Sequence, residues 1–269
     1  MTKALARDPI YRRRRFQPAI IELCVRWYLA YRLSYRDLVE MMADRGIVVS
    51  HSTILRWVQR YVPEFEKRWS RYARSVHSSW RMDETAVPVR GGNHYLYRAV
   101  DKYGKTVDSL LCTDRSDLSA RGFFCKAVET HHPRWPTKLN LDGNAASHRA
   151  LRMLRQENPH WRSVDIRSRR YLNNIVEQDH RAIKRRCAPM LAMKSFRTAA
   201  ITLAGIELAH RIRKRQFSFG SRGPHELPSL KHAWARALAS SDDATAGRES
   251  IRGANVHRDC TRTQQAPAC

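Results

Sequence analysis

The feature that most constrains the fold of this chain is a change in hydrophobic periodicity near Trp80. Before this residue, apolar side chains recur at the three- and four-residue spacing of helices. After it, they form short runs of period two, separated by turn residues such as Gly91-Gly92 and Gly104. Because the two periods require different backbones, the sequence predicts a helical N-terminal domain over residues 1–75 and a β-rich domain over residues 76–217.

Three helices are predicted in the N-terminal domain. The first covers residues 18–31, the second covers residues 35–44 after the cap Ser34, and the third begins after the cap Ser50. A polar set faces outward from the third helix: His51, Ser52, Thr53, Arg56, Gln59 and Arg60. This is the pattern of a helix-turn-helix whose recognition helix reads DNA. The alternative is that three short amphipathic helices share this periodicity and bind nothing.

The second domain is predicted to begin with an antiparallel meander and to continue with strands reached through helices. Strands are expected at 80–89, 94–100, 107–113, 137–141 and 163–167, and helices at 118–130, 144–156, 175–186 and 196–215. This order is that of the ribonuclease-H-like fold, so the predicted class is α/β with a mixed sheet. Residues 218–269 are expected to form a disordered or divergent tail with one helix at 231–239.

The charge of the chain predicts its partner. Lys and Arg number 50 against 25 Asp and Glu, a formal net charge of +25 that is typical of proteins binding nucleic acid. The run from Arg12 to Arg15 is interpreted as a phosphate clamp, with a solvated tail as the alternative. No apolar run is long enough for a membrane span or a secretory signal, so we expect no membrane partner and a cytoplasmic location.

Three carboxylates stand where this fold would bring them together. Asp83 lies in the first strand, Asp142 at the end of the fourth, and Glu177 in the first turn of the helix that follows the fifth. Such a set suits phosphoryl transfer on two Mg²⁺ ions. Each residue also has a structural explanation. Asp142 could shape a turn, and Glu177 could belong to a capping box. Asp83 adjoins Glu84, and because strand pleating puts the two side chains on opposite faces, only one of them can face the metal site.

These residues resemble a known family. Asp83 and Asp142 are separated by 58 residues, and Asp142 and Glu177 by 34. With the segments YLYRAVD at 95–101 and YLNNIVEQDHRAIK at 171–184, this spacing closely resembles the insertion-sequence-six family of DDE transposases, over about residues 16–217.

The resemblance implies both chemistry and partners. It implies two Mg²⁺ ions, which Mn²⁺ can replace, held by Asp83, Asp142 and Glu177 as catalytic residues. It implies double-stranded DNA as substrate, with cleavage at the terminal inverted repeats of a bacterial insertion sequence. The freed 3′ hydroxyl would join target DNA and give a cointegrate. Because two DNA ends must be processed together, a homo-oligomer is expected, acting in the bacterial cytoplasm at the nucleoid.

Basic residues follow Glu177 on the same helical face. Arg181 and Lys184 lie four and seven positions further along. The resemblance implies that Lys184 contacts the DNA backbone near the scissile phosphate. Arg181 is predicted to pair with Glu177 or with phosphate, a surface ion pair of little energetic consequence being the alternative.

Two other functions stay open: a catalytically inactive relic or DNA-binding regulator, and a nuclease that cuts without joining.

Overall fold

The computed structural model describes residues 8–190, 193–219 and 230–238. Its N-terminal part consists of a short 3₁₀ turn and three helices: η1 (Pro9–Tyr11), α1 (Pro18–Ala30), α2 (Tyr35–Ala43) and α3 (His51–Ser70). The hydroxyls of Ser34 and Ser50 accept hydrogen bonds from the N–H groups of Asp37 and Thr53. Both predicted N-caps are therefore confirmed.

A five-stranded mixed sheet follows these helices. Its strands are β1 (Ser79–Val89), β2 (Gly92–Asp101), β3 (Thr106–Cys112), β4 (Lys138–Asn140) and β5 (Asp165–Arg167). Their order is β3-β2-β1-β4-β5, with an antiparallel meander from β1 to β3 and with β4 and β5 parallel to β1. The first and fourth strands are neighbours as predicted, and the mixed α/β, ribonuclease-H-like class is confirmed.

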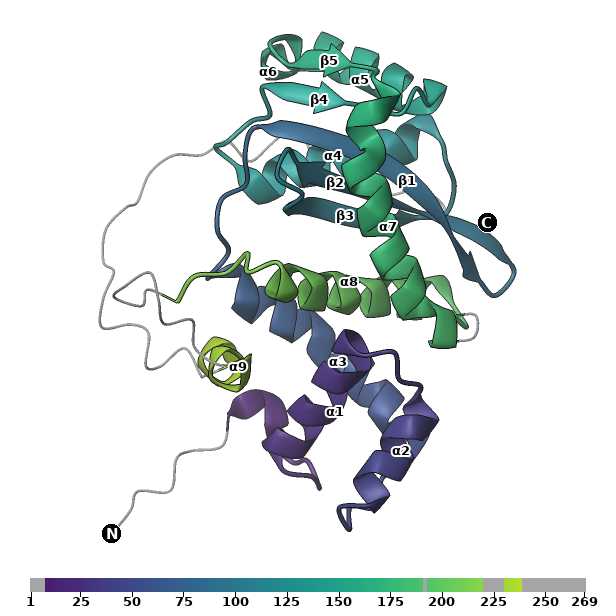
Figure 1. Cartoon of the computed structure of the whole chain (residues 1–269), viewed down its shortest axis with the longest axis vertical. Coiled ribbons are helices and arrows are strands. Elements are labelled where there is room, and N and C mark those ends of the chain that lie inside the picture. The colour runs from purple at the N-terminus through teal and green to yellow at the C-terminus, as the bar shows by residue number, and fades with distance from the viewer. Residues whose placement is uncertain (1–7, 191–192, 220–229, 239–269) are drawn as a thin grey trace. The chain divides into compact units, whose positions relative to one another are not determined.

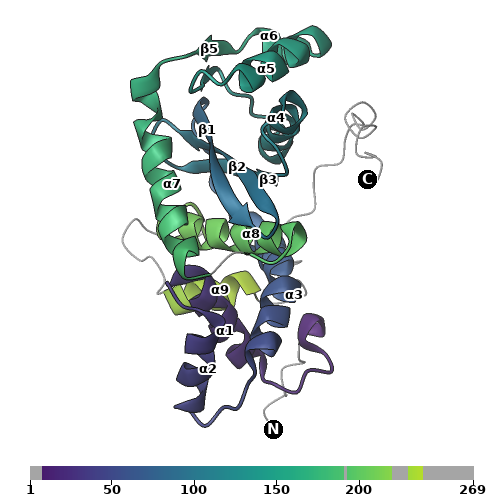
Figure 2. The same cartoon turned by 90° about the vertical axis from the view of Figure 1, so that its right-hand side faces the viewer.

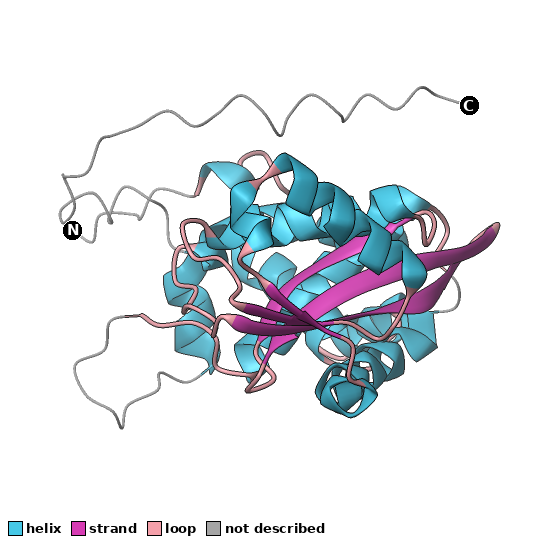
Figure 3. Cartoon of the chain, turned by 90° about the horizontal axis from the view of Figure 1, so that it is seen from above, coloured by secondary structure: helices cyan, strands magenta, loops and turns pink. Residues whose placement is uncertain are grey.

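Helices cover both faces of the sheet (Figures 2 and 3). They are α4 (Asp117–His131), α5 (Ala145–Glu157), α6 (Pro159–Arg162), α7 (Asn174–Cys187) and α8 (Phe196–Arg213), with 3₁₀ turns η2 (Arg170–Asn173) and η3 (Ala188–Met190) beside α7. Side chains of β1 pack into two different hydrophobic cores. Trp80 and Met82 pack with α4 and α5, whereas Val87 and Val89 pack with α8 and the N-terminal helices.

Helix α8 lies between the sheet and helices α1 to α3 (Figure 1). Gly205 of α8 allows this close approach, since it faces Leu29 of α1 and Val62 of α3. The helical core thus continues onto one face of the sheet, and the described residues form one compact unit. The boundary at residue 75 between two domains stays a prediction.

The last described helix is α9 (Leu230–Leu238), close to the helix predicted at 231–239. Its Trp234 is buried and packs edge-on against Trp69 and Phe65 of α3. This part of the predicted tail therefore belongs to the core of the N-terminal helices. Residues 220–229 and 239–269 lie outside the described residues.

The helix contact at Gly205 generates a test with an internal control. In Gly205→Ala the new Cβ would lie 2.6 Å from Leu29 Cδ2 and 3.0 Å from Val62 Cγ1. Overpacking costs about 1–3 kcal/mol, more than the gain of up to about 1 kcal/mol in helix propensity. We expect a lower midpoint of urea denaturation. In Gly122→Ala on α4, nothing lies within 4 Å of the new Cβ, so the midpoint should rise. A rise in both variants would contradict the close packing of α8.

Candidate active site

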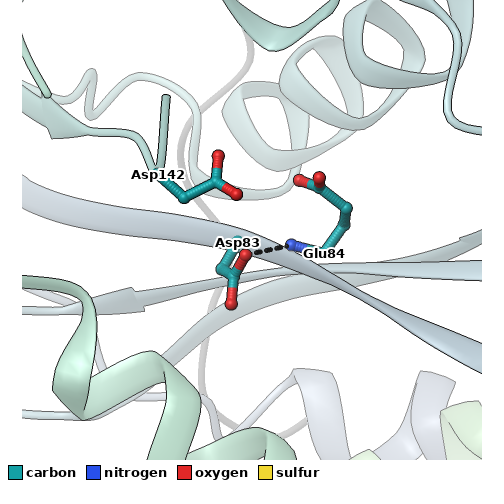
Figure 4. Close-up of side chains that lie close together, drawn as sticks. All are labelled: Asp83, Glu84 and Asp142. Atoms are coloured by element: carbon teal, nitrogen blue, oxygen red, sulfur yellow. Dashed lines mark hydrogen bonds between the residues drawn. The ribbon is translucent and has the colours of Figure 1, made fainter. Parts of the chain in front are cut away.

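Three carboxylates meet where β4 ends: Asp83 and Glu84 from β1, and Asp142 just past β4 (Figure 4). One oxygen of each lies within 4.8 Å of the others. Figure 4 shows Glu84 and Asp142 on one side of β1 and the Asp83 carboxylate on the other, as the strand pleat requires. The predicted placement of the two adjacent acids on opposite faces is thus seen, although both still reach the same cluster, and which of them faces a metal stays a prediction.

The reason lies in the short pairing of β1 with β4. The two strands pair only from Ser79 to Arg81 of β1. From Met82 onward, β4 no longer covers this edge, so side chains from both faces of β1 can reach the same point. The Asn173 amide caps the opened edge by donating a hydrogen bond of 3.4 Å to the carbonyl of Met82.

Asp142 has two roles at once. Its Oδ1 accepts a hydrogen bond of 3.0 Å from the backbone N–H of Asn144, across a turn in which Gly143 has a φ of +92°. This turn was the structural explanation considered for Asp142, and it is confirmed. The Oδ2 atom remains on the side of the carboxylate cluster, 3.7 Å from the guanidinium of Arg115. The turn role therefore does not remove the residue from the site.

Glu84 is held in place by two donors. Its side chain is 1% exposed, and its Oε1 accepts hydrogen bonds from Arg115 and, at 2.8 Å, from the Asn144 amide. Burial and the charge of Asp142 raise the pKa of Glu84 above its usual range. Sequence reasoning missed Arg115 and the part played by Glu84, because Arg115 stands in a loop without periodicity, 31 residues from Glu84.

Helix α7 reaches the cluster through His180. This buried histidine places its Nδ1 atom 3.2 Å from Asp83 Oδ2. Glu177 lies one turn earlier on α7, is half-buried, and does not belong to the group of carboxylates within 4.8 Å. Within residues 8–190, 193–219 and 230–238, the Glu177 carboxylate forms no hydrogen bond or ion pair. The structure thus brings together two of the three predicted residues and places the third on the adjacent helix.

The alternative explanation of Glu177 as part of a capping box finds no support in α7. The N-cap residue Asn173 makes no capping hydrogen bond through its side chain. Its Oδ1 instead accepts a bond of 2.7 Å from the Asn140 amide of β4, while its Nδ2 contacts β1. The start of α7 is therefore tied to the two strands that carry Asp83 and Asp142.

Comparison with known proteins decides the family. Residues 77–216 match a family model described as a DDE domain. Two transposases of Staphylococcus aureus are each 35% identical to this chain over 205 residues. One is the transposase for the insertion sequence-like element IS431mec, and the other is that for the insertion sequence element IS257 in transposon Tn4003. The matched residues cover 76% of this chain and 89% of each relative. The chain belongs to the insertion-sequence-six family of DDE transposases. It is therefore an enzyme of DNA phosphoryl transfer.

Solved structures resemble the chain in part. The catalytic core domain of BIV integrase is 18% identical, with a TM-score of 0.37, over 59% of this chain and 97% of that chain. The HTLV-2 integrase catalytic core domain in complex with magnesium is 15% identical, with a TM-score of 0.37, over 49% and 84%. The fold class of this DDE transposase rests on its own strand order and not on these similarities.

A buried ionic network fixes α7 against the sheet. Arg98 of β2 has a fully buried side chain and contacts Asp179 of α7 at 2.9 Å and Glu207 of α8 at 2.6 Å. His210 and Lys214 also contact the Asp179 carboxylate, at 2.9 and 2.5 Å. Burial alone would raise the pKa of Asp179, but the hydrogen bond from His210 and the charges of Arg98 and Lys214 outweigh it and lower the pKa well below its usual range.

The predicted DNA contacts differ in their surroundings. His51, Arg56 and Arg60 are exposed on α3, and Ser52 and Thr53 are half-buried in its first turn. Gln59 does not face outward with them, since its amide donates hydrogen bonds to Thr198 and Thr202 of α8 at 3.4 and 3.3 Å.

The two basic residues predicted beside Glu177 are exposed. They are Arg181 and Lys184 of α7, and neither forms an ion pair within the described part of the chain. The pairing of Arg181 with Glu177 is thus not seen. Contact of either residue with phosphate stays a prediction.

The ionic network predicts a large effect of one substitution. Arg98→Met would leave the buried carboxylates of Asp179 and Glu207 without their guanidinium, at a cost of about 3–5 kcal/mol in the free energy of unfolding. The control is Arg121→Met, which removes a partly exposed pair with Glu157 and should cost about 0–1 kcal/mol. Urea denaturation of both variants measures the difference. Equal losses would show that the network does not stabilise this packing.

Proposed function

We propose that this transposase binds the terminal inverted repeats of its insertion sequence and catalyses Mg²⁺-dependent cleavage and strand transfer into target DNA, with a cointegrate as product. The observation that carries the proposal is the approach of Asp83 and Asp142 at the opened edge of β1, next to the start of α7. Carboxylates gathered at one sheet edge suit the binding of divalent cations, and the family supplies DNA as the substrate class.

The donor set fits the proposed cofactor. Carboxylate oxygens are the ligands that Mg²⁺ prefers, and the side chains of Asp83 and Asp142 are 14% and 27% exposed, so solvent and substrate can reach them. We propose Asp83, Asp142 and Glu177 as ligands of two Mg²⁺ ions, with Mn²⁺ as a substitute. Bound metal would polarise the scissile phosphate and activate the attacking hydroxyl.

The surrounding residues have supporting parts in this proposal. His180 orients the Asp83 carboxylate, and Asn173 fixes the first turn of α7, which carries Glu177. Glu84 is not proposed as a ligand, because its side chain is 1% exposed and its Oε1 is engaged by Arg115 and Asn144. Its Oε2 is buried without a hydrogen-bond partner among the described residues, so the ligand choice is tested directly below. Glu84 instead holds the positive charge of Arg115 beside Asp142, which reduces repulsion among the carboxylates.

The proposed DNA contacts fall into two groups. His51, Ser52, Thr53, Arg56 and Arg60 of α3 would bind the terminal repeats, and Arg181 and Lys184 of α7 would contact the backbone near the scissile phosphate. Gln59 is left out, since α8 engages its amide.

Assembly and location complete the proposal. Two DNA ends must react together, so we propose a homo-oligomer on DNA that acts at the bacterial nucleoid in the cytoplasm. Among the helices of the described residues, none has the length and apolarity needed to cross a membrane.

The catalytic proposal is tested by strand transfer on labelled terminal-repeat DNA in Mg²⁺. Glu177→Gln, Asp83→Asn and Asp142→Asn remove one charge each and should lower the yield of joined products by more than about 100-fold while DNA binding persists. The matched control is Glu129→Gln, an exposed carboxylate on α4, which should keep full activity. Nicks without joined products would favour a nuclease. DNA binding without cleavage by the unaltered protein would favour the inactive relic.

The choice of ligands is tested by binding of Mn²⁺, followed by electron paramagnetic resonance. Asp83→Asn should weaken Mn²⁺ binding by more than about 100-fold, since it removes a proposed ligand. Glu84→Gln keeps an acceptor for Arg115 and should weaken binding by less than about 10-fold. If the two variants lose Mn²⁺ equally, Glu84 is itself a ligand and the proposed set is wrong.

A further inference from the structure

A second site lies between the N-terminal arginine run and α3. We propose that it is a binding pocket for a single backbone phosphate of duplex DNA, which the arginine run and α3 contact together. The proposal rests on the proposed DNA-binding function and adds the group that is bound. The pocket has a volume of about 230 Å³, and five arginines line it: Arg13, Arg14, Arg15, Arg56 and Arg60.

Aromatic packing holds the two walls together. Phe16, which ends the arginine run, packs edge-on against Trp57 of α3 with ring centroids 5.1 Å apart. Trp57 and Thr53 of α3 also line the pocket. The arm is thus fixed beside the polar face of the helix. Arg13 to Arg15 and the arginines of α3 are therefore brought to one cavity, although about 40 residues of chain separate them.

The charge in the pocket is uncompensated. No acidic side chain lines it, and within the part of the chain that the structure describes none of the five arginines forms a salt bridge. The Nε atom of Arg14 is buried and has no hydrogen-bond partner among those residues. Buried donors are almost always paired, and like charges gathered at one cavity repel each other. An anion with several acceptor oxygens would satisfy both requirements.

Size and position favour a DNA phosphate over other anions. The cavity is smaller than the pockets that hold drug-sized ligands, and it has room for an anionic group. Guanidinium groups bind phosphate oxygens in paired hydrogen bonds. Arg56 and Arg60 are exposed on the helix proposed to bind the terminal repeats, where a DNA backbone would pass beside it. A phosphate held here would set the register of α3 on the duplex.

The test measures the salt dependence of DNA binding by the full-length protein. A random-sequence duplex is the probe, because phosphate contacts do not depend on sequence. Arg14→Gln and Arg56→Gln should each weaken binding and make the negative slope of log K against log salt less steep, by up to about 0.9 for one lost phosphate. The double variant should reduce the steepness by the same amount of about 0.9, not twice as much, since both arginines contact the same phosphate.

The matched control is Arg12→Gln, which makes the same charge change in the same run but lies outside the pocket. It should change the slope by much less. Equal effects of Arg12→Gln and Arg14→Gln would overturn the proposal in favour of a diffuse basic arm. If the salt slope of the double variant corresponds to the loss of about two phosphate contacts, the proposal of one shared phosphate would be overturned. Circular dichroism of each variant excludes unfolding as the cause.

Strand transfer separates this proposal from the proposed function. Unchanged salt slopes in both pocket variants, with normal strand transfer by the unaltered protein, would overturn the pocket alone. If the salt slopes of the pocket variants change as predicted but the unaltered protein forms no joined products, transposition alone would be overturned. If the unaltered protein binds no duplex, inorganic phosphate is the probe. At equal ionic strength, phosphate should stabilise the unaltered protein against heat more than chloride does, and this effect should be lost in Arg14→Gln but kept in Arg12→Gln. That result would support an anion site, and the absence of stabilisation by phosphate would overturn it.

Discussion

The buried guanidinium of Arg98 is the interaction on which the arrangement of this catalytic fold depends. It joins β2, α7 and α8 in one place, through Asp179 and Glu207. Taking such a group out of water is costly, so an apolar cluster of equal volume could stabilise the fold as well. A charged network, however, tolerates few relative positions of its partners. We infer that its contribution is to geometry, because Asp179 lies only two residues from Glu177 on α7.

Helix α8 extends this constraint from the active site to the N-terminal helices. It supplies Glu207 to the ionic network, Gly205 to the contact with α1 and α3, and the acceptors that hold Gln59 of α3. These contacts lie on one rigid helix. If a duplex binds along α3 as proposed, it would be held in a defined orientation to the sheet, and the proposed reaction at Asp83 and Asp142 requires such an orientation.

The sequence predicted the elements well and their long-range contacts poorly. Hydrophobic period and caps such as Ser34 and Ser50 are local signals, so helices and strands could be placed within a few residues. The order of the elements then placed Asp83 beside Asp142. The engagement of Glu84 by Arg115 and Asn144, which are 31 and 60 residues away, depends on where β1 loses its partner strand. The inward turn of Gln59 depends in the same way on α8.

Glu177 lies on the helix beside the carboxylate cluster and not within it, and this arrangement limits the negative charge gathered there. Asp83, Glu84 and Asp142 already place three carboxylates within 4.8 Å, and Arg115 offsets only part of their charge. Burial chiefly raises the pKa of Glu84, and the charge of Asp142 raises it further, so this repulsion contributes to the shift. A further carboxylate would add to it unless a cation offset the charge. His180 and Asn173 tie α7 to β1, so the helix that carries Glu177 lies next to the cluster, where the proposed metal would offset the charge of a further carboxylate.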